Sequence, residues 1–261
     1  MNKKKFLQSF IIILVFLLAV YGNRLLQRFV IISFDSPIIN LMYSYAWWII
    51  PIVIVIGLLY GFENILKVLC LDKKLFSGLA FGLIAVSPML ISSAILGELD
   101  KDIDWLIFLK NTLFAGFMEE VLFRGFLFGI LFRKLGWGFI PATLLGAIIF
   151  GLGHLYQSSA ANEMIGIFFI TFIGSAWFAW LFIEWKENLW IPIFLHALMN
   201  LSWILFNMSD NALGDTYTNI FRIVTIAFTI VATILYNVKR DKFRINSKNL
   251  LTNKITIANT V

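Results

Sequence analysis

The amino-acid sequence predicts an all-α fold, a polytopic transmembrane helix bundle of about eight spans. Of its 261 residues, 60% are hydrophobic and 14% are charged, whereas soluble domains are about half apolar and about a quarter charged. Apolar stretches of the length that a helix needs to cross a bilayer, about 20 residues, recur along the chain. The 27 phenylalanines and 9 tryptophans are residue types that membrane interiors and interfaces favour.

Each predicted span is an apolar stretch between polar or turn-forming residues. The first follows Lys3-Lys4-Lys5 and lacks a small-residue cleavage site, so we interpret it as an uncleaved helix and not as a signal peptide. The fifth begins with Gly136-Trp137-Gly138, and we expect residues 136–141 to be interfacial, with the true span starting near Pro141. The expected spans are roughly 6–23, 43–62, 75–97, 105–132, 137–157, 163–183, 189–207 and 218–238.

The distribution of basic residues predicts the orientation in the membrane. Cytoplasmic loops of membrane proteins hold an excess of lysine and arginine. With the N-terminus inside, the outer segments hold Arg24, Arg28 and Lys101, and the outer stretch from Glu98 to Asp104 is mostly acidic. We therefore expect an even number of spans in a bacterial plasma membrane, with both termini cytoplasmic. The inner basic residues are Lys3, Lys4, Lys5, Lys67, Lys73, Lys74, Arg133, Lys134, Lys186 and those from Lys239 onward.

The sequence predicts one integral membrane domain over residues 1–261, without a repeat or a soluble domain. Residues of about 105–207 form the expected catalytic core, and 239–261 form a short basic cytoplasmic tail at the surface. Membrane topology explains the net charge of +6, and no basic, aromatic-rich surface segment indicates a nucleic-acid partner. The expected partners are the lipid bilayer and a peptide or protein substrate. Cys70 is the single cysteine, which excludes an intramolecular disulfide.

Charged side chains within the fourth span are the first candidates for chemistry. An arginine or aspartate at the centre of a membrane helix costs on the order of 2.5–3.5 kcal/mol, so such residues usually serve a function. Glu120 and Arg124 are four residues apart and share a helix face, where they can pair. Glu119 is rotated by about 100° from Glu120, so it is the less neutralised carboxylate and can exchange a proton with water. The alternative is a structural ion-pair network between helices.

The only two histidines of the chain also lie in apolar segments. His154 lies near the end of the fifth span, while His196 lies in the seventh, with Asn200 on the same face four residues later. Gly151 and Gly153 would let another helix approach His154 closely. A lone buried histidine is more often a hydrogen-bonded core residue than a catalyst. Two histidines beside two membrane carboxylates favour a functional site.

These side chains are compatible with three kinds of site. Carboxylates and imidazoles suit a zinc ion that keeps an open position for water. They also suit metal-free hydrolysis, in which glutamate and histidine activate water while histidine and asparagine stabilise an oxyanion. A transporter could use the same residue types as a proton relay. Asn200 favours acyl chemistry, because a neutral amide donor suits an oxyanion.

Three ordered motifs resemble those of the CAAX protease and bacteriocin-processing family, also called the CPBP or Abi family. The family pattern is Glu-Glu-x-x-x-Arg, then Phe-x-x-x-His, then His-x-x-x-Asn on successive core helices. One such motif is a weak signal, whereas three in the right order on hydrophobic spans are fairly specific. In this sequence they are Glu119-Glu120-x-x-x-Arg124, Phe150-x-x-x-His154 and His196-x-x-x-Asn200.

The resemblance implies an intramembrane endopeptidase with its site in the bilayer. It implies that Glu119 and His154 activate water, and that His196 and Asn200 line the oxyanion site. Some members cleave prenylated CAAX proteins, and bacterial members are linked to peptide maturation, bacteriocin immunity or signalling. Both a metalloprotease and a metal-free glutamate mechanism stay open; the candidate ligands of a zinc ion are Glu119, His154 and His196. A transporter and a non-catalytic scaffold or immunity protein are the alternatives.

Overall fold

The computed structural model of the chain describes residues 2–239 and 243–253. The chain is 75% helical, and the only β-type pairing within the described ranges is an isolated bridge between Trp137 and Thr252. This confirms the all-α prediction. The long helices are α1 (Lys3–Leu26), α2 (Pro37–Tyr60), α4 (Leu75–Leu96), α8 (Phe139–Gly153), α9 (Ala161–Glu184), α10 (Trp190–Ile204) and α11 (Thr216–Val238).

The fourth predicted span is one helical run from Trp105 to Arg133 that contains two π-helical segments. Its elements are α5 (Trp105–Leu109), η2 (Lys110–Phe114), α6 (Ala115–Glu120), η3 (Val121–Phe128) and α7 (Gly129–Arg133), with η2 and η3 in π-helical form. The remaining short helices are η1 (Phe62–Asn64), α3 (Ile65–Val68) and η4 (Leu155–Gln157).

Within residues 2–239 and 243–253, six helices are long and apolar enough to cross a membrane: α1, α2, α4, α8 together with η4, α9 and α11. The apolar helix α10 is shorter, with 15 residues, and the 105–133 run is divided by its π segments. The chain is therefore a multi-pass integral membrane protein. Helix α8 begins at Phe139, two residues before the expected start at Pro141, and Trp137 precedes the helix as predicted.

Local sequence signals set several helix ends. Pro37 occupies the first turn of α2, where its missing N–H is not needed. The helix stops at Gly61, whose φ of +90° only glycine adopts readily. Asp215 starts α11 through a capping box with Thr218, whose backbone N–H donates to the Asp215 carboxylate at 2.7 Å. Hydrogen bonds from Thr218 lower the pKa of Asp215, because they stabilise its charged form.

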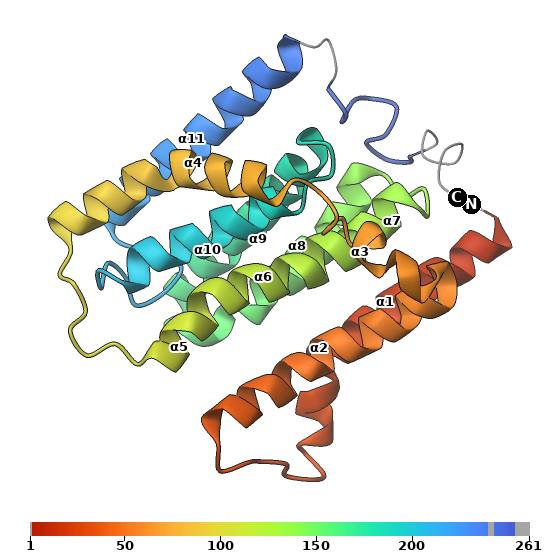
Figure 1. Cartoon of the computed structure of the whole chain (residues 1–261), viewed down its shortest axis with the longest axis horizontal. Helices are drawn as coiled ribbons and strands as arrows, with labels where there is room; N and C mark the ends of the chain where they lie inside the picture. The colour runs from red at the N-terminus through yellow and green to blue at the C-terminus, as the bar shows by residue number, and fades with distance from the viewer. Residues whose placement is uncertain (1, 240–242, 254–261) are drawn as a thin grey trace. The chain divides into compact units, whose positions relative to one another are not determined.

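The fold divides into two compact units. Unit 1 consists of Met1–Asp72, Met118–Ala142 and Lys248–Val261, and unit 2 consists of Lys73–Phe117 and Thr143–Ser247. In unit 1, α1 and α2 form a hairpin and lie side by side (Figure 1). Gly22 permits their close approach, because a Cβ atom there would lie 2.9 Å from the Trp47 ring. The Phe16 ring meets Phe123 of η3 edge-on, with centroids 5.1 Å apart.

The C-terminal segment of unit 1 caps the first turn of α8. The first N–H groups of a helix lack partners within the helix. Here Phe139 donates its backbone N–H to the Asn249 carbonyl, and Ile140 donates to the Leu250 carbonyl, both at 2.9 Å. Asn249 is buried. Most residues of 243–253 are exposed, in keeping with the predicted surface tail, but Asn249 and Asn253 are buried and bind backbone groups of unit 1. Residues 240–242 and 254–261 lie outside the described residues.

Asn253 binds the segment that connects α7 to α8. Its side-chain amide donates to the Phe132 carbonyl in the last turn of α7, at 3.0 Å, and its backbone N–H donates to the Gly136 carbonyl, at 3.0 Å. Gly138 must be small, because a Cβ atom there would lie 2.1 Å from the backbone of Leu251. The tail thus supplies hydrogen-bond partners to the start of α8 and to the end of α7, where backbone groups lack partners within their own helix.

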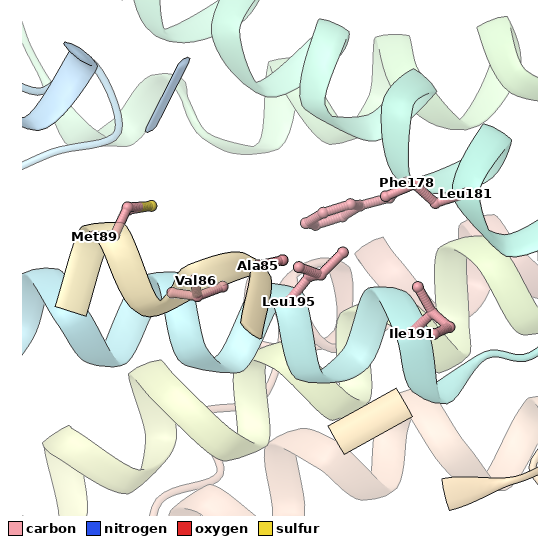
Figure 2. Close-up of a cluster of buried hydrophobic side chains, with 7 residues drawn as sticks. All are labelled: Ala85, Val86, Met89, Phe178, Leu181, Ile191 and Leu195. Carbon is pink, nitrogen blue, oxygen red and sulfur yellow. The ribbon is translucent and has the colours of Figure 1, made fainter. Parts of the chain in front are cut away.

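The core of unit 2 forms where α4, α9 and α10 meet. Figure 2 shows its buried cluster, with Phe178 and Leu181 from α9 facing side chains of the other two helices. Helices α4 and α10 approach closely at Gly78, where a Cβ atom would lie 2.7 Å from the Trp190 backbone. The cluster consists of Ala85, Val86, Met89, Phe178, Leu181, Ile191 and Leu195.

Helix α11 turns its polar face inward. The indole N–H of Trp177 donates to the Thr229 hydroxyl at 3.1 Å, and the indole N–H of Trp185 donates to Thr233 at 2.9 Å. Its outward face is apolar and exposed. This arrangement suits a helix whose outer surface contacts lipid, where threonine can hydrogen-bond across helices. The buried residues of α11 are Thr218, Arg222, Thr225, Thr229, Thr233 and Asn237.

The last residue of α9, Glu184 in unit 2, has a buried carboxylate. Glu184 accepts hydrogen bonds from the Asn237 side chain at 2.8 Å and from the backbone N–H groups of Arg244 and Ile245 at 3.1 and 3.0 Å. Arg244 also forms an ion pair with Glu187. Several donors therefore offset the cost of burying this carboxylate.

Candidate functional site

The carboxylates and the arginine of the first motif lie in unit 1, where α6 passes into η3. Arg124 Nη1 donates to Glu120 Oε1 at 3.0 Å, and both side chains are buried, with exposures of 2% and 0%. This confirms the predicted pairing at four-residue spacing. The η3 segment around Arg124 is buried throughout, so the ion pair lies in a medium that strengthens it and makes an unpaired charge costly.

Glu119 lies in a different environment from its neighbour. It is half-buried, whereas Glu120 is fully buried. Arg124 interacts electrostatically with Glu120 and, more weakly, with Glu119. Tyr45 of α2 is also within electrostatic range of Glu119. Glu119 is therefore the more exposed of the two residues, and Glu120 is the one that forms the 3.0 Å ion pair with Arg124.

His154 lies directly after α8, in unit 2, and its tautomer follows from one contact. Its Nδ1 is 2.7 Å from the Phe150 carbonyl oxygen. A carbonyl oxygen can only accept, so Nδ1 carries the hydrogen. In the neutral imidazole, Nε2 then carries the lone pair that can bind a proton or a metal ion. The four-residue spacing of the Phe-x-x-x-His motif thus gives a backbone contact and a contact between the two rings.

The same phenyl ring lies beside both histidines. The Phe150 ring centroid is 4.4 Å from the His154 ring and 6.5 Å from the His196 ring. The Phe178 ring lies 5.7 Å from His196 on α10. Unit 2 therefore places both imidazoles beside one phenyl ring, although they are 42 positions apart in the sequence (154 and 196).

Asn200 lies one turn after His196 on α10, as its spacing predicts. Its Nδ2 donates to the Asn111 carbonyl of η2 at 2.9 Å. The helical run approaches α10 closely nearby, because a Cβ atom on Gly116 would lie 2.8 Å from the Ala197 backbone nitrogen. Gly116 precedes Glu119 by three residues on the same helix, and Ala197 follows His196.

The two glycines before His154 have different surroundings. A Cβ atom on Gly151 would lie 2.8 Å from the Phe168 ring of α9, so this glycine permits the close helix approach that was predicted. Gly153 has no atom within 4 Å of such a Cβ. The prediction that Gly153 also serves helix packing was therefore wrong.

The predicted zinc ligands divide between the units, with Glu119 in unit 1 and His154 and His196 in unit 2. The two imidazoles of unit 2 are candidate ligands. Within residues 2–239 and 243–253, no group of three or more His, Cys, Asp or Glu side chains that could hold a metal ion occurs. A catalytic zinc ion usually has three protein ligands.

Sequence reasoning did not identify Asn111, Phe178 or Tyr45 as neighbours of the candidate site. No pattern in the sequence shows that η2 is π-helical, and this geometry determines which carbonyl faces α10. Phe178 and Tyr45 are two of many aromatic residues in apolar spans. The sequence signal that was present is Gly116, a small residue one turn before Glu119.

The long apolar helices and the buried polar side chains define a multi-pass membrane protein with ionisable groups inside its spans. Residues 101–202 match the family model described as type II CAAX prenyl endopeptidase Rce1-like. This range contains all three motifs, so the predicted resemblance to the CAAX protease family is confirmed. The comparisons with curated proteins and with solved structures gave no match.

Proposed function

We propose that the chain is an intramembrane endopeptidase that hydrolyses a peptide bond of a membrane-associated peptide or CAAX-type protein. The observation that carries this proposal is the family match over residues 101–202, which include every candidate catalytic residue. The buried Glu120–Arg124 pair and the fixed tautomer of His154 agree with it. A CAAX-type substrate is the first to test, because the matched family is named for that activity.

In the proposed reaction, a water molecule attacks the carbonyl carbon of the scissile peptide bond. Glu119 and His154 remove a proton from this water, and His154 can accept a proton on Nε2 because Nδ1–H is bound to the Phe150 carbonyl. His196 and the Asn200 amide donate to the resulting oxyanion. The proton then passes to the leaving nitrogen as the C–N bond breaks. Arg124 neutralises Glu120 and keeps the second carboxylate out of this exchange.

The test is peptide cleavage by purified protein in detergent, with prenylated and unprenylated CAAX peptides and a mixed peptide library. We expect Glu119→Gln to abolish cleavage while the protein still inserts and accumulates, because glutamine keeps the shape and removes the base. A general base contributes about 10²–10⁴-fold to a rate. Glu98→Gln, in an exposed loop, is the matched control. Cleavage by Glu119→Gln at the wild-type rate would end the water-activation role.

The histidines and the metal question are tested together. We expect His154→Ala and His196→Ala each to lose activity. Metal content separates the two mechanisms: in a zinc enzyme each variant also loses metal. Activity that survives exhaustive chelation, in protein without bound metal by elemental analysis, supports the glutamate–histidine mechanism. Substrate-dependent flux in liposomes without any cleavage would instead identify a transporter.

A further inference from the structure

The π-helical turn η2 changes the hydrogen bonding of one carbonyl group. In an α-helix, the N–H of residue 115 would donate to the carbonyl of residue 111. Here the Ala115 N–H bonds to the carbonyl oxygens of Lys110 and Thr112. It therefore bypasses the Asn111 carbonyl that lies between them. π-bulges of this kind occur often at functional sites.

The bypassed carbonyl is bound by a residue of the candidate site. Asn200 Nδ2, from α10, donates to the Asn111 oxygen at 2.9 Å. The backbone on both sides of this contact is fixed. The hydroxyl of Thr112, which is fully buried, donates to the Phe108 carbonyl at 2.7 Å, and Gly116 lies against α10 with no room for a Cβ atom.

This bond determines how the Asn200 side chain is oriented. The asparagine amide has two N–H bonds on Nδ2 and one carbonyl oxygen, and rotation about the Cα–Cβ and Cβ–Cγ bonds orients it. Nδ2 donates one of its N–H groups to the Asn111 carbonyl, and a carbonyl cannot donate to the amide oxygen. The contact therefore fixes Nδ2 on the side of η2 and fixes the direction of the second N–H group relative to α10.

We propose that Asn111 is a positioning residue, whose carbonyl is released by the π turn and orients the Asn200 amide as an oxyanion donor. The inference rests on the proposed function, because it treats the Asn200 amide as a hydrogen-bond donor to the oxyanion of that reaction. A preoriented donor stabilises charge that develops in the transition state without reorganising first. The identity of the Asn111 side chain is not important for this role, because the contact uses its backbone.

The experiment replaces single backbone amides of the full-length protein by esters. An α-hydroxy acid with the threonine side chain at position 112 makes the Asn111 carbonyl an ester, which is a weaker acceptor. The matched control is an α-hydroxy acid with the leucine side chain at position 113, which removes one helical N–H in the same turn and weakens the Thr112 carbonyl. We expect the ester at 112 to lower kcat about five- to tenfold with little change in KM, and the ester at 113 to change kcat much less.

A second measurement follows the Asn200 amide directly. Its ¹⁵N side-chain resonance is assigned by its loss in Asn200→Ala, and we expect it to move with the ester at 112 and not at 113. Equal kcat values for both esters, or a resonance that moves while kcat stays constant, would overturn the positioning role. If the unmodified protein cleaves no peptide while the resonance behaves as expected, the proposed function fails and the contact is structural.

Discussion

Glu119 and Glu120 are consecutive residues with the same chemistry and different surroundings. Glu120 has no exposed surface and is bound to Arg124 at 3.0 Å, while Glu119 is half-buried. A helical step of about 100° between neighbours is sufficient to separate a structural carboxylate from an accessible one. Sequence spacing alone predicted this difference, because the four-residue interval identifies Arg124 as the partner of Glu120.

A double-mutant cycle tests the pair. Breaking a buried ion pair on one side is expected to cost about 3–5 kcal/mol, because an unpaired charge remains. Glu120→Ala and Arg124→Leu should therefore each lower the thermal stability of the protein in detergent. The double variant should recover much of the loss without recovering cleavage, since Glu119 then lacks its neighbouring charge. Stability losses that simply add would show that the two residues do not stabilise each other.

Other details at the residue scale could not be predicted from the sequence. The tautomer of His154 depends on a 2.7 Å contact with a backbone carbonyl, and the orientation of Asn200 depends on a π turn. Both are backbone effects, whereas sequence motifs record side-chain types. The motifs therefore identified the polar side chains, and the structure supplied their orientation.

At the scale of elements, glycines determine where helices touch. Gly116 lies against the backbone of Ala197, which cannot move aside like a flexible side chain. We expect Gly116→Ala to separate α6 from α10, to destabilise the protein by about 1–3 kcal/mol as overpacking does, and to reduce cleavage. Gly174→Ala is the matched control within α9, because nothing lies within 4 Å of a Cβ atom there. Equal melting temperatures in detergent for the two variants would contradict this.

The C-terminal segment supplies hydrogen-bond partners to helix ends of unit 1. A chain that ends after Ser247 loses the partners of the Phe139 and Ile140 N–H groups and of the Phe132 carbonyl. Each buried group left without a partner costs about 1–3 kcal/mol, so we expect a clear fall in the melting temperature in detergent. A chain that ends after Asn253 keeps these bonds and serves as the control. Equal melting temperatures for the two truncated proteins would show that the prediction is wrong.

Helix positions were predictable because a bilayer requires long apolar stretches, and every predicted span coincides with helical residues. The packed tail was not predictable, since its contacts use polar side chains and backbone groups in a basic, low-hydropathy segment. Asn249 and Asn253 look like surface residues in the sequence, but both are buried. A buried asparagine that binds backbone groups leaves no hydropathy signal.

At the scale of the whole molecule, the positive charge predicts the orientation in the membrane. We expect both termini in the cytoplasm, because lysine and arginine collect in alternate connections. Reporter fusions after Lys5 and at Val261 measure this directly. An external signal at either end would mean that the number of crossings differs by one from the prediction. The short helix α10 and the 105–133 run are the segments where such an error would arise.

The inward polar face of α11 has a consequence for how this sequence can vary over evolutionary time. In a water-soluble helix, apolar positions are constrained by packing and polar positions drift. On α11 the exposed positions, such as Ile223, Phe228 and Val231, only have to remain hydrophobic, so any aliphatic or aromatic residue is acceptable there. Thr229 and Thr233 each accept an indole N–H, and few residue types can replace them. Among relatives that share this helix, variation should therefore concentrate on its apolar side, and the threonines should change least.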